Sequence, residues 1–219
     1  MTTLTPEEAT YYLERPDDDQ RPNELASIVC GLFAAVVAVG ARIAARRISR
    51  ARLGPEDWAI FAAMAGEITY AVVFSRAVDN GQGRHIVFIK DMYHLQGFVI
   101  AIVSYSYTVM FTKISILIFY CRLFRLRWMV ICSWVVAAIV IMYNMTVILI
   151  AGLQCIPLSD LWTGGPSCIN TEPSFTGLAV VNIITDVAIL ALPIKPVLSL
   201  NMKTSRKVQV LGIFLLGGV

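Results

Sequence analysis

Five long apolar stretches dominate the chain, and each is long enough to cross a lipid bilayer as a helix. They cover residues 25–41, 58–74, 95–121, 128–152 and 175–192. A transmembrane helix needs about 20 mainly apolar residues to cross a hydrocarbon layer about 30 Å thick. A sixth apolar stretch, residues 208–219, reaches the last residue. We therefore predict an all-α, polytopic transmembrane helix bundle with five full spans and part of a sixth.

The composition supports a membrane protein rather than a soluble domain. The chain is 57% hydrophobic and only 15% charged, whereas soluble domains carry about 25% charged residues. Residues 1–23 are polar and acidic and contain three prolines. We predict two parts, an extracellular polar tail (residues 1–23) and a transmembrane helical domain (residues 24–219) that is incomplete at its C-terminus.

The basic residues lie mainly in alternate connections between the spans, which predicts an orientation. Twelve of the 18 Lys and Arg residues are in the first, third and fifth connections: Arg42, Arg46, Arg47, Arg50, Arg52, Arg122, Arg125, Arg127, Lys195, Lys203, Arg206 and Lys207. Five others, Arg15, Arg21, Arg76, Arg84 and Lys90, are on the opposite side. Because cytosolic loops attract positive charge, we expect an integral protein of the plasma membrane with its N-terminus outside.

The sequence predicts lipid as a partner and gives no sign of nucleic-acid binding, of a cofactor or of a metal site. The basic residues flank spans, which suits contact with anionic lipid. His85 and His94 are nine residues apart, a spacing that fits no helical metal pair. No Ser, Cys or Thr stands in an arrangement typical of nucleophilic catalysis, so we do not expect an enzyme.

Two of the five cysteines, Cys155 and Cys168, lie in the fourth connection, on the predicted outer side. Disulfides form and persist in such an oxidising compartment. We favour a disulfide bond between them over two unpaired thiols, because the connection is polar and rich in Pro and Gly. Cys30, Cys121 and Cys132 lie in or at the ends of spans, where a thiol acts as a small apolar side chain.

Three ionisable residues lie inside the spans: Glu67, Lys113 and Asp186. A charge at mid-span is costly, so each should face the interior of the bundle and a partner. At about 1.5 Å per residue, Lys113 and Asp186 are about 12 Å and 9 Å from the cytosolic boundary. We therefore predict that these two residues pair, with Glu67, at a depth of about 13.5 Å, as a third member or an alternative partner.

Helical spacing adds polar neighbours to this predicted pair. Asn182 and Asp186 are four residues apart and share one side of their span. Ser106, Lys113 and Tyr120 recur every seven residues and share a stripe, so we expect Asn182 and Tyr120 close to the pair. Three interpretations remain open. The first, which we favour, is an ion pair that fixes how the spans pack, and the second is a polar switch or ion site. Lys113 reaching the inner headgroups is a third.

Several motifs, in order along the chain, resemble one family. The segment TKISILIFYCRLF (residues 112–124) resembles the third-span signature of the fungal rhodopsin-domain integral membrane proteins. Further similar segments are LGPEDW (53–58), GRHI (83–86), Cys155-Pro157-Trp162-Cys168, NIITDVAILALPI (182–194) and RKVQVLGIFLLG (206–217). The family's Lys and Asp positions correspond to Lys113 and Asp186.

This resemblance implies a seven-helix, G-protein-coupled-receptor-like protein, of which the chain is a fragment. It implies a receptor-like function, sensing an extracellular ligand or surface cue and engaging a cytosolic signalling partner. The family name does not by itself supply retinal, because a Schiff-base lysine would be expected on the last span, which is absent here, and nothing in the sequence indicates that Lys113 binds a chromophore. Two alternatives stay open: a transporter or accessory membrane protein of a secondary-metabolite pathway, and a membrane-embedded enzyme. The ligand itself does not follow from the sequence.

Overall fold

The computed structural model describes residues 20–50, 52–79, 94–155 and 172–199, which are helical apart from short turns. Six helices occur in these ranges: α2 (Arg21–Ile48), α3 (Pro55–Asp79), α4 (His94–Phe124), α5 (Arg127–Leu153), α7 (Glu172–Ala191) and α8 (Ile194–Ser199). The described ranges contain no β-strand, which confirms the predicted all-α class.

Five of these helices are long and apolar enough to cross a membrane, as the sequence predicts. Helices α2 to α5 each extend past both ends of the predicted stretch, because flanking polar residues continue the helix. Helix α7 begins three residues before the predicted stretch and ends one residue before its end. The apolar stretch 208–219 and most of the N-terminal tail lie outside the described residues.

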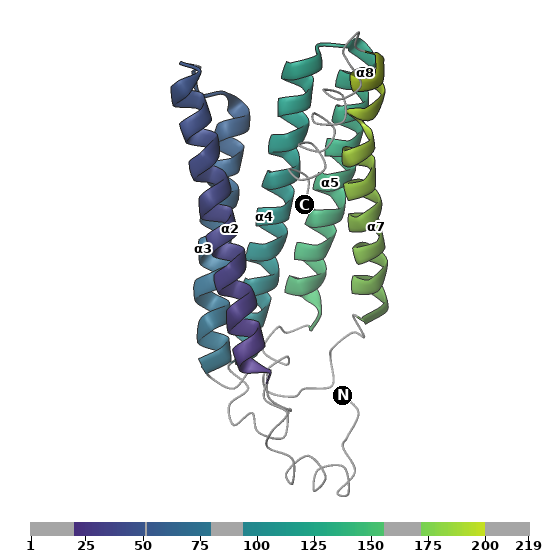
Figure 1. Cartoon of the computed structure of the whole chain (residues 1–219). Helices are drawn as coiled ribbons and strands as arrows, with labels where there is room; N and C mark the ends of the chain where they lie inside the picture. The colour runs from purple at the N-terminus through teal and green to yellow at the C-terminus, as the bar shows by residue number, and fades with distance from the viewer. Residues whose placement is uncertain (1–19, 51, 80–93, 156–171, 200–219) are drawn as a thin grey trace, which may run out of the picture.

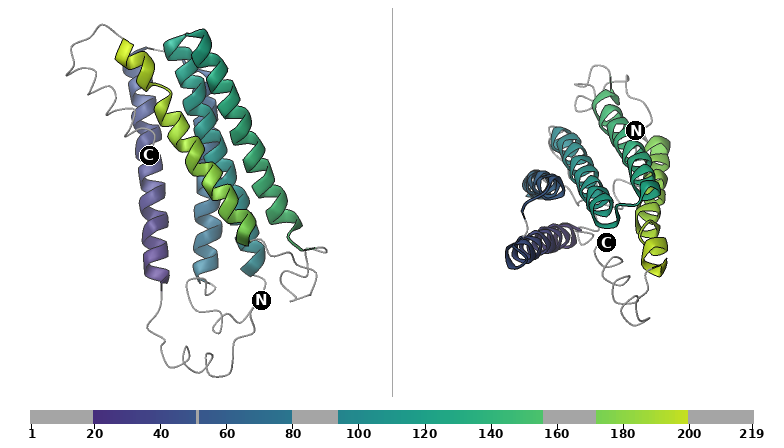
Figure 2. Two further views of the ribbon diagram at one scale, coloured as in Figure 1. Left: turned by 90° about the vertical axis from the view of Figure 1, so that its right-hand side faces the viewer. Right: turned by 90° about the horizontal axis from the view of Figure 1, so that it is seen from above.

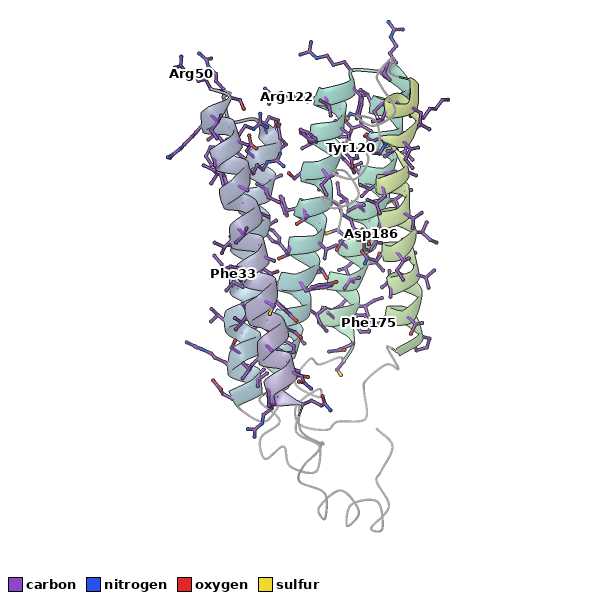
Figure 3. The ribbon with its side chains drawn as sticks, viewed as in Figure 1. Phe33, Arg50, Tyr120, Arg122, Phe175 and Asp186 are labelled. Carbon is purple, nitrogen blue, oxygen red and sulfur yellow. The ribbon has the colours of Figure 1, made fainter. Side chains whose placement is uncertain are left out.

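The long helices run antiparallel to their chain neighbours and form one bundle (Figure 1). Helix α2 packs on α3, α3 on α4, α4 on α5 and α5 on α7, so α4 lies between the first pair and the last pair (Figure 2). We call the end at which α2 and α4 finish the basic end. It is uppermost in Figure 3, where Arg50 and Arg122 mark it.

The most extensive contact between helices is that of α3 with α4, and small side chains explain it. Ala59, Ala63 and Gly66 are buried along one side of α3. The Thr108 hydroxyl of α4 donates a hydrogen bond to the carbonyl oxygen of Ala63 at 3.4 Å. A Cβ at Gly66 would meet Thr108 Oγ1 at 2.6 Å and Tyr107 Cδ1 at 2.8 Å. Small residues of this kind allow helix backbones to approach each other in membranes.

The outer faces of the bundle carry large apolar side chains, as a lipid-facing surface does. Phe33, Trp134, Met142 and Ile183 are each more than 60% exposed. Exposed apolar surface on this scale marks a membrane or partner interface rather than a surface that meets water. The interior apolar clusters lie between α4, α5 and α7 and include Leu117, Tyr120, Val140, Tyr143 and Ile189.

Two short turns shape the basic end. Only Arg125 and Leu126 separate α4 from α5, and Arg125 has a left-handed backbone with φ 44°. A left-handed residue commonly ends a helix, because it turns the chain sharply. Pro193 lies between α7 and α8, where its missing amide hydrogen and its ring interrupt a continuous helix.

Candidate functional site

Lys113 projects from the buried side of α4 and reaches α7. Its Nζ lies 2.9 Å from Asp186 Oδ1 and donates hydrogen bonds to Asn182 Oδ1 at 2.7 Å, to Thr185 Oγ1 at 2.9 Å and to the Asn182 carbonyl oxygen at 3.1 Å. The Lys113 side chain is 7% exposed and that of Asp186 is 43% exposed. The structure therefore brings together the two residues that depth along the spans predicts to pair.

The α7 partners of Lys113 share one side of their helix because of their spacing. Asn182, Thr185 and Asp186 stand at positions i, i+3 and i+4, which are neighbours on a helix surface. The Thr185 hydroxyl also donates to the Asn182 carbonyl oxygen at 2.8 Å. One helix thus supplies a carboxylate, an amide oxygen, a hydroxyl and a backbone carbonyl to one ammonium group. These contacts offset the cost of placing a charge inside a membrane span.

Helix α5 completes the site through Tyr143. The Tyr143 hydroxyl donates to Asn182 Oδ1 at 2.7 Å, and Lys113 Nζ is 5.5 Å from the centre of the tyrosine ring. A cation at this distance from an aromatic face is attracted by the ring quadrupole. We call Lys113, Tyr143, Asn182, Thr185 and Asp186 the lysine site, and it joins α4, α5 and α7.

A cavity of about 650 Å³ lies between α3, α4, α5 and α7 and adjoins the lysine site. Tyr143 and Asn182 line it on that side, and Phe175 lines it near the end of α7 away from the basic end (Figure 3). Tyr105 and Val109 contribute from α4. The volume is within the range of about 300–1,000 Å³ that is usual for small-molecule sites. The chain therefore has a ligand-sized space that contacts two residues of the lysine site, Tyr143 and Asn182.

Glu67, predicted as a third member of the pair, is elsewhere, and that part of the prediction is wrong. Its side chain faces α2, since a Cβ added at Gly31 would lie 3.8 Å from Glu67 Oε1. It lines a second cavity of about 300 Å³ with Glu24 and Tyr70. Depth along a span does not fix the direction in which a side chain points, so matched depth alone was insufficient.

Tyr120 and Ser106 flank Lys113 on α4, as the seven-residue spacing predicts, but they belong to different environments. Tyr120 is buried in an apolar cluster with Leu117 and Ile189, nearer the basic end than Asp186 (Figure 3). Seven residues correspond to about 10.5 Å along the helix axis, so Tyr120 is displaced from the lysine site. Ser106 lines the cavity on the other side of that site.

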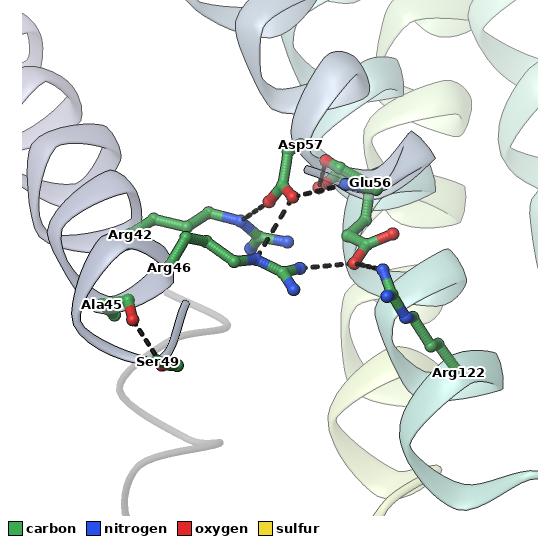
Figure 4. Close-up of polar contacts among 9 residues, drawn as sticks. Arg42, Ala45, Arg46, Ser49, Glu56, Asp57 and Arg122 are labelled. Atoms are coloured by element: carbon green, nitrogen blue, oxygen red, sulfur yellow. Dashed lines mark hydrogen bonds and ion pairs between the residues drawn. The ribbon is translucent and has the colours of Figure 1, made fainter. Parts of the chain in front are cut away.

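A second polar cluster lies at the basic end and was not predicted. Asp57 Oδ1 is 2.8 Å from Arg42 Nε, and Asp57 Oδ2 is 3.2 Å from Arg46 Nε. Glu56 Oε1 pairs with Arg46 and lies 2.7 Å from Arg122 Nη1. The carboxylate side chains are 0% and 2% exposed. We call these five residues the arginine–carboxylate cluster, and it ties α2, α3 and α4 together (Figure 4).

The local sequence around the start of α3 places both carboxylates. Gly54 precedes the helix and Pro55 occupies its first position, where a missing amide hydrogen is tolerated. Asp57 Oδ2 accepts a hydrogen bond from the Gly54 amide at 2.8 Å, which satisfies a free donor at the helix start. Ser115 of α4 donates to the Glu56 carbonyl oxygen at 2.6 Å. The only sequence signal was the Gly-Pro-Glu-Asp segment, which marks a helix start rather than a site.

The structure also describes one of the two cysteines of the fourth connection. Cys155 is buried and disulfide-bonded. Its predicted partner, Cys168, lies outside the described residues, so the pairing stays a prediction. Within the described ranges, no group of three or more His, Cys, Asp or Glu side chains could hold a metal ion.

Apolar spanning helices, an interior ion pair and an adjoining cavity define a polytopic helical membrane protein with a candidate ligand site. Comparison with known families identifies the group more closely. The chain belongs to the fungal rhodopsin domain family, whose model matches residues 41–219. No solved structure matches the chain.

Three relatives show what proteins the chain resembles. It is 26% identical to the "Polyenoic acids biosynthesis gene cluster protein Ba17b" of Metarhizium anisopliae, over 84% of this chain and 53% of that protein. It is 30% identical to a "SAT4 family membrane protein" of Emericella nidulans, over 69% of this chain and 42% of that protein. It is 26% identical to "Receptor GIN3" of Arthrobotrys oligospora, over 84% of this chain and 46% of that protein. The chain thus spans about half the length of these relatives.

Proposed function

We propose that the chain is part of a receptor-like membrane protein that binds a small molecule in the 650 Å³ cavity. One observation carries this proposal: Asn182 and Tyr143 line the cavity and also hydrogen-bond within the lysine site. A molecule that contacts these two side chains therefore acts on the polar contacts that join α4 to α7. A ligand shifts a helix arrangement only through such differential contacts. The likeness to Receptor GIN3 supports this class of function.

Binding, rather than catalysis, fits the lining of the cavity. The described residues that line it include no Asp, Glu, His, Cys or Lys. Catalysis by the Ser106 and tyrosine hydroxyls of the lining would need an activating acid or base within hydrogen-bond reach, and the described lining residues supply none. We therefore propose that the protein is not an enzyme.

We further propose that the basic end faces the cytosol and that the cavity is reached from outside. The excess of Lys and Arg in the connections at the basic end supports this orientation. It would present Arg47, Arg50 and Arg127 to anionic lipid and to a cytosolic signalling partner. A membrane-impermeant maleimide applied to intact cells tests the orientation with two variants, Ser49→Cys and Gln20→Cys. We expect labelling only at position 20, and strong external labelling at position 49 would contradict the orientation.

An energy-transfer sensor tests the receptor proposal. Donor and acceptor fluorophores are placed in two basic-end connections of the full-length protein, and the probe is an organic extract of fungal culture medium. We expect the extract to change the transfer efficiency in the unaltered protein and not in Ala179→Trp, which fills the cavity from α7. The control is Ile183→Trp on the same helix, because Ile183 is 61% exposed and faces outward. An equal response in both variants would refute the cavity as the sensing site.

A second candidate is a transporter or accessory membrane protein of a biosynthetic pathway, and the name of the Metarhizium relative, a biosynthesis gene cluster protein, favours it. Sealed vesicles that contain the full-length protein distinguish the two. Accumulation of an extract component inside the vesicles, without any change in energy transfer, would favour transport over the receptor proposal.

A further inference from the structure

We propose that the cavity selects a neutral, mainly apolar molecule that carries one hydroxyl or carbonyl group. This inference rests on the proposed binding function and concerns the chemistry of the ligand. It follows from the hydrogen-bonding capacity that the lysine site leaves unused.

The charge beside the cavity is already neutralised. A lysine ammonium has three N–H donors, and four acceptor atoms lie within 3.1 Å of Lys113 Nζ: Asn182 Oδ1, Thr185 Oγ1, Asp186 Oδ1 and the Asn182 carbonyl oxygen. Lys113 therefore keeps no free donor for an anionic ligand. The pair with Asp186 has no net charge, so neither sign of ligand charge is attracted.

The walls of the cavity provide no counter-charge either. The described lining residues include no Asp, Glu, Lys or Arg, and most of them are apolar or aromatic, such as Phe74, Ile102, Val147 and Leu178. A charged ligand would lose its hydration there without gaining an ion pair, which costs far more than the burial of a neutral polar group. Ligand charge is therefore selected against.

Two side chains of the lysine site that line the cavity keep unused hydrogen-bonding capacity. The Asn182 side-chain oxygen accepts from Lys113 and from Tyr143, so the amide orientation is fixed and its NH₂ group remains a donor. The Tyr143 hydroxyl uses its hydrogen on Asn182, so its oxygen remains an acceptor. A ligand hydroxyl can accept from Asn182 and donate to Tyr143, and a carbonyl can accept from Asn182.

Protection of a cysteine from alkylation tests the ligand class directly. Ala179→Cys places a thiol on the cavity wall of the full-length protein in lipid nanodiscs, and mass spectrometry follows its reaction with a small maleimide. The probes share one chain length: 1-decanol, decane, decanoate and decylammonium. We expect 1-decanol to protect most, about threefold to tenfold better than decane, which is the effect of a typical net hydrogen bond. Decanoate and decylammonium should protect least.

Two controls make the result specific. Ile183→Cys, which faces outward, should gain no protection from any probe, since it reports only probe dissolved in the bilayer. Tyr143→Phe should remove part of the advantage of 1-decanol over decane and leave protection by decane unchanged, whereas Tyr107→Phe, away from the cavity, should change neither.

Three outcomes would overturn the inference: equal or better protection by decanoate or decylammonium, equal protection by decane and 1-decanol, or a thiol at position 179 that reacts only after denaturation. The last would mean that another part of the protein fills the cavity. Selective protection by 1-decanol without any response of the energy-transfer sensor would instead refute the receptor proposal and leave the ligand class intact.

Discussion

The two polar clusters of this bundle pair buried charges in different ways. The lysine site has one ion pair inside the spans and surrounds its ammonium with neutral acceptors, Asn182 and Thr185. The arginine–carboxylate cluster has two carboxylates, Glu56 and Asp57, held by three arginines at the basic end. The first adjoins a ligand-sized cavity, whereas the second joins the ends of three helices.

This difference indicates different roles. Polar neutral groups such as Asn182 can exchange partners with a ligand without exposing a charge, so the lysine site is suited to respond to cavity occupancy. The carboxylates of the other cluster are almost fully buried, and breaking a buried ion pair leaves an uncompensated charge. We therefore interpret the arginine–carboxylate cluster as a structural clamp on α2, α3 and α4.

The largest expected effect is that of Glu56→Gln. Glu56 is the shared partner of Arg46 and Arg122 and is fully buried. The substitution should lower the free energy of unfolding by about 3 kcal/mol, the low end for breaking a buried pair, because Arg46 keeps Asp57. Reversible unfolding of the full-length protein in lipid bicelles measures it. Asp79→Asn, at the exposed end of the same helix, is the control. If both variants are equally stable, the clamp interpretation fails.

A somewhat smaller effect on stability is expected for Gly66→Ala. This substitution tests the packing of α3 against α4, the helix that carries residues of both clusters. The added Cβ would meet Thr108 Oγ1 at 2.6 Å and Tyr107 Cδ1 at 2.8 Å, so these side chains or the two helices must shift. Overpacking of this kind costs about 1–3 kcal/mol of unfolding free energy. Gly40→Ala is the matched control, since nothing lies within 4 Å of its added Cβ. A Gly66→Ala protein as stable as Gly40→Ala would contradict the observed α3–α4 packing.

The smallest effect is expected for Arg122→Gln, which separates the members of the clamp. The Arg122 side chain is 49% exposed, and Glu56 keeps its pair with Arg46. Partly exposed ion pairs contribute about 0–1 kcal/mol, so the unfolding free energy should fall by no more than that. Unfolding in the same bicelles compares it with Glu56→Gln. A loss as large as that of Glu56→Gln would mean that Arg122, not burial of the carboxylate, holds the cluster together.

The spans were predictable because a membrane requires long apolar runs, and such runs are visible in one sequence. Their ends were less so, since Arg21, Glu24 and Arg46 continue helices beyond the apolar residues. The Lys113–Asp186 pair was also accessible, because charges inside spans are rare and their depth can be counted from the span ends. The four-residue spacing added Asn182.

The other features of the two clusters depend on how each helix is rotated about its axis. The sequence of a mainly apolar span does not specify that rotation. Glu67 has a depth similar to that of Lys113 but faces α2. Thr185 and Tyr143 belong to the lysine site, yet hydroxyl residues are ordinary in spans and gave no signal. Glu56 and Asp57 stand at a span boundary, where charges usually face water. Only the packing of three helices shows that they are buried.

The most direct test of the account is a double-mutant cycle on Lys113 and Asp186. The free energy of unfolding of the full-length protein is measured for Lys113→Met, Asp186→Asn, the double variant and the unaltered protein in lipid bicelles. We predict that each single substitution destabilises the protein and that the double variant is more stable than the additive expectation by at least about 1 kcal/mol. Additivity within about 0.5 kcal/mol would show that the two side chains do not interact, and it would contradict the lysine site on which the proposed function depends.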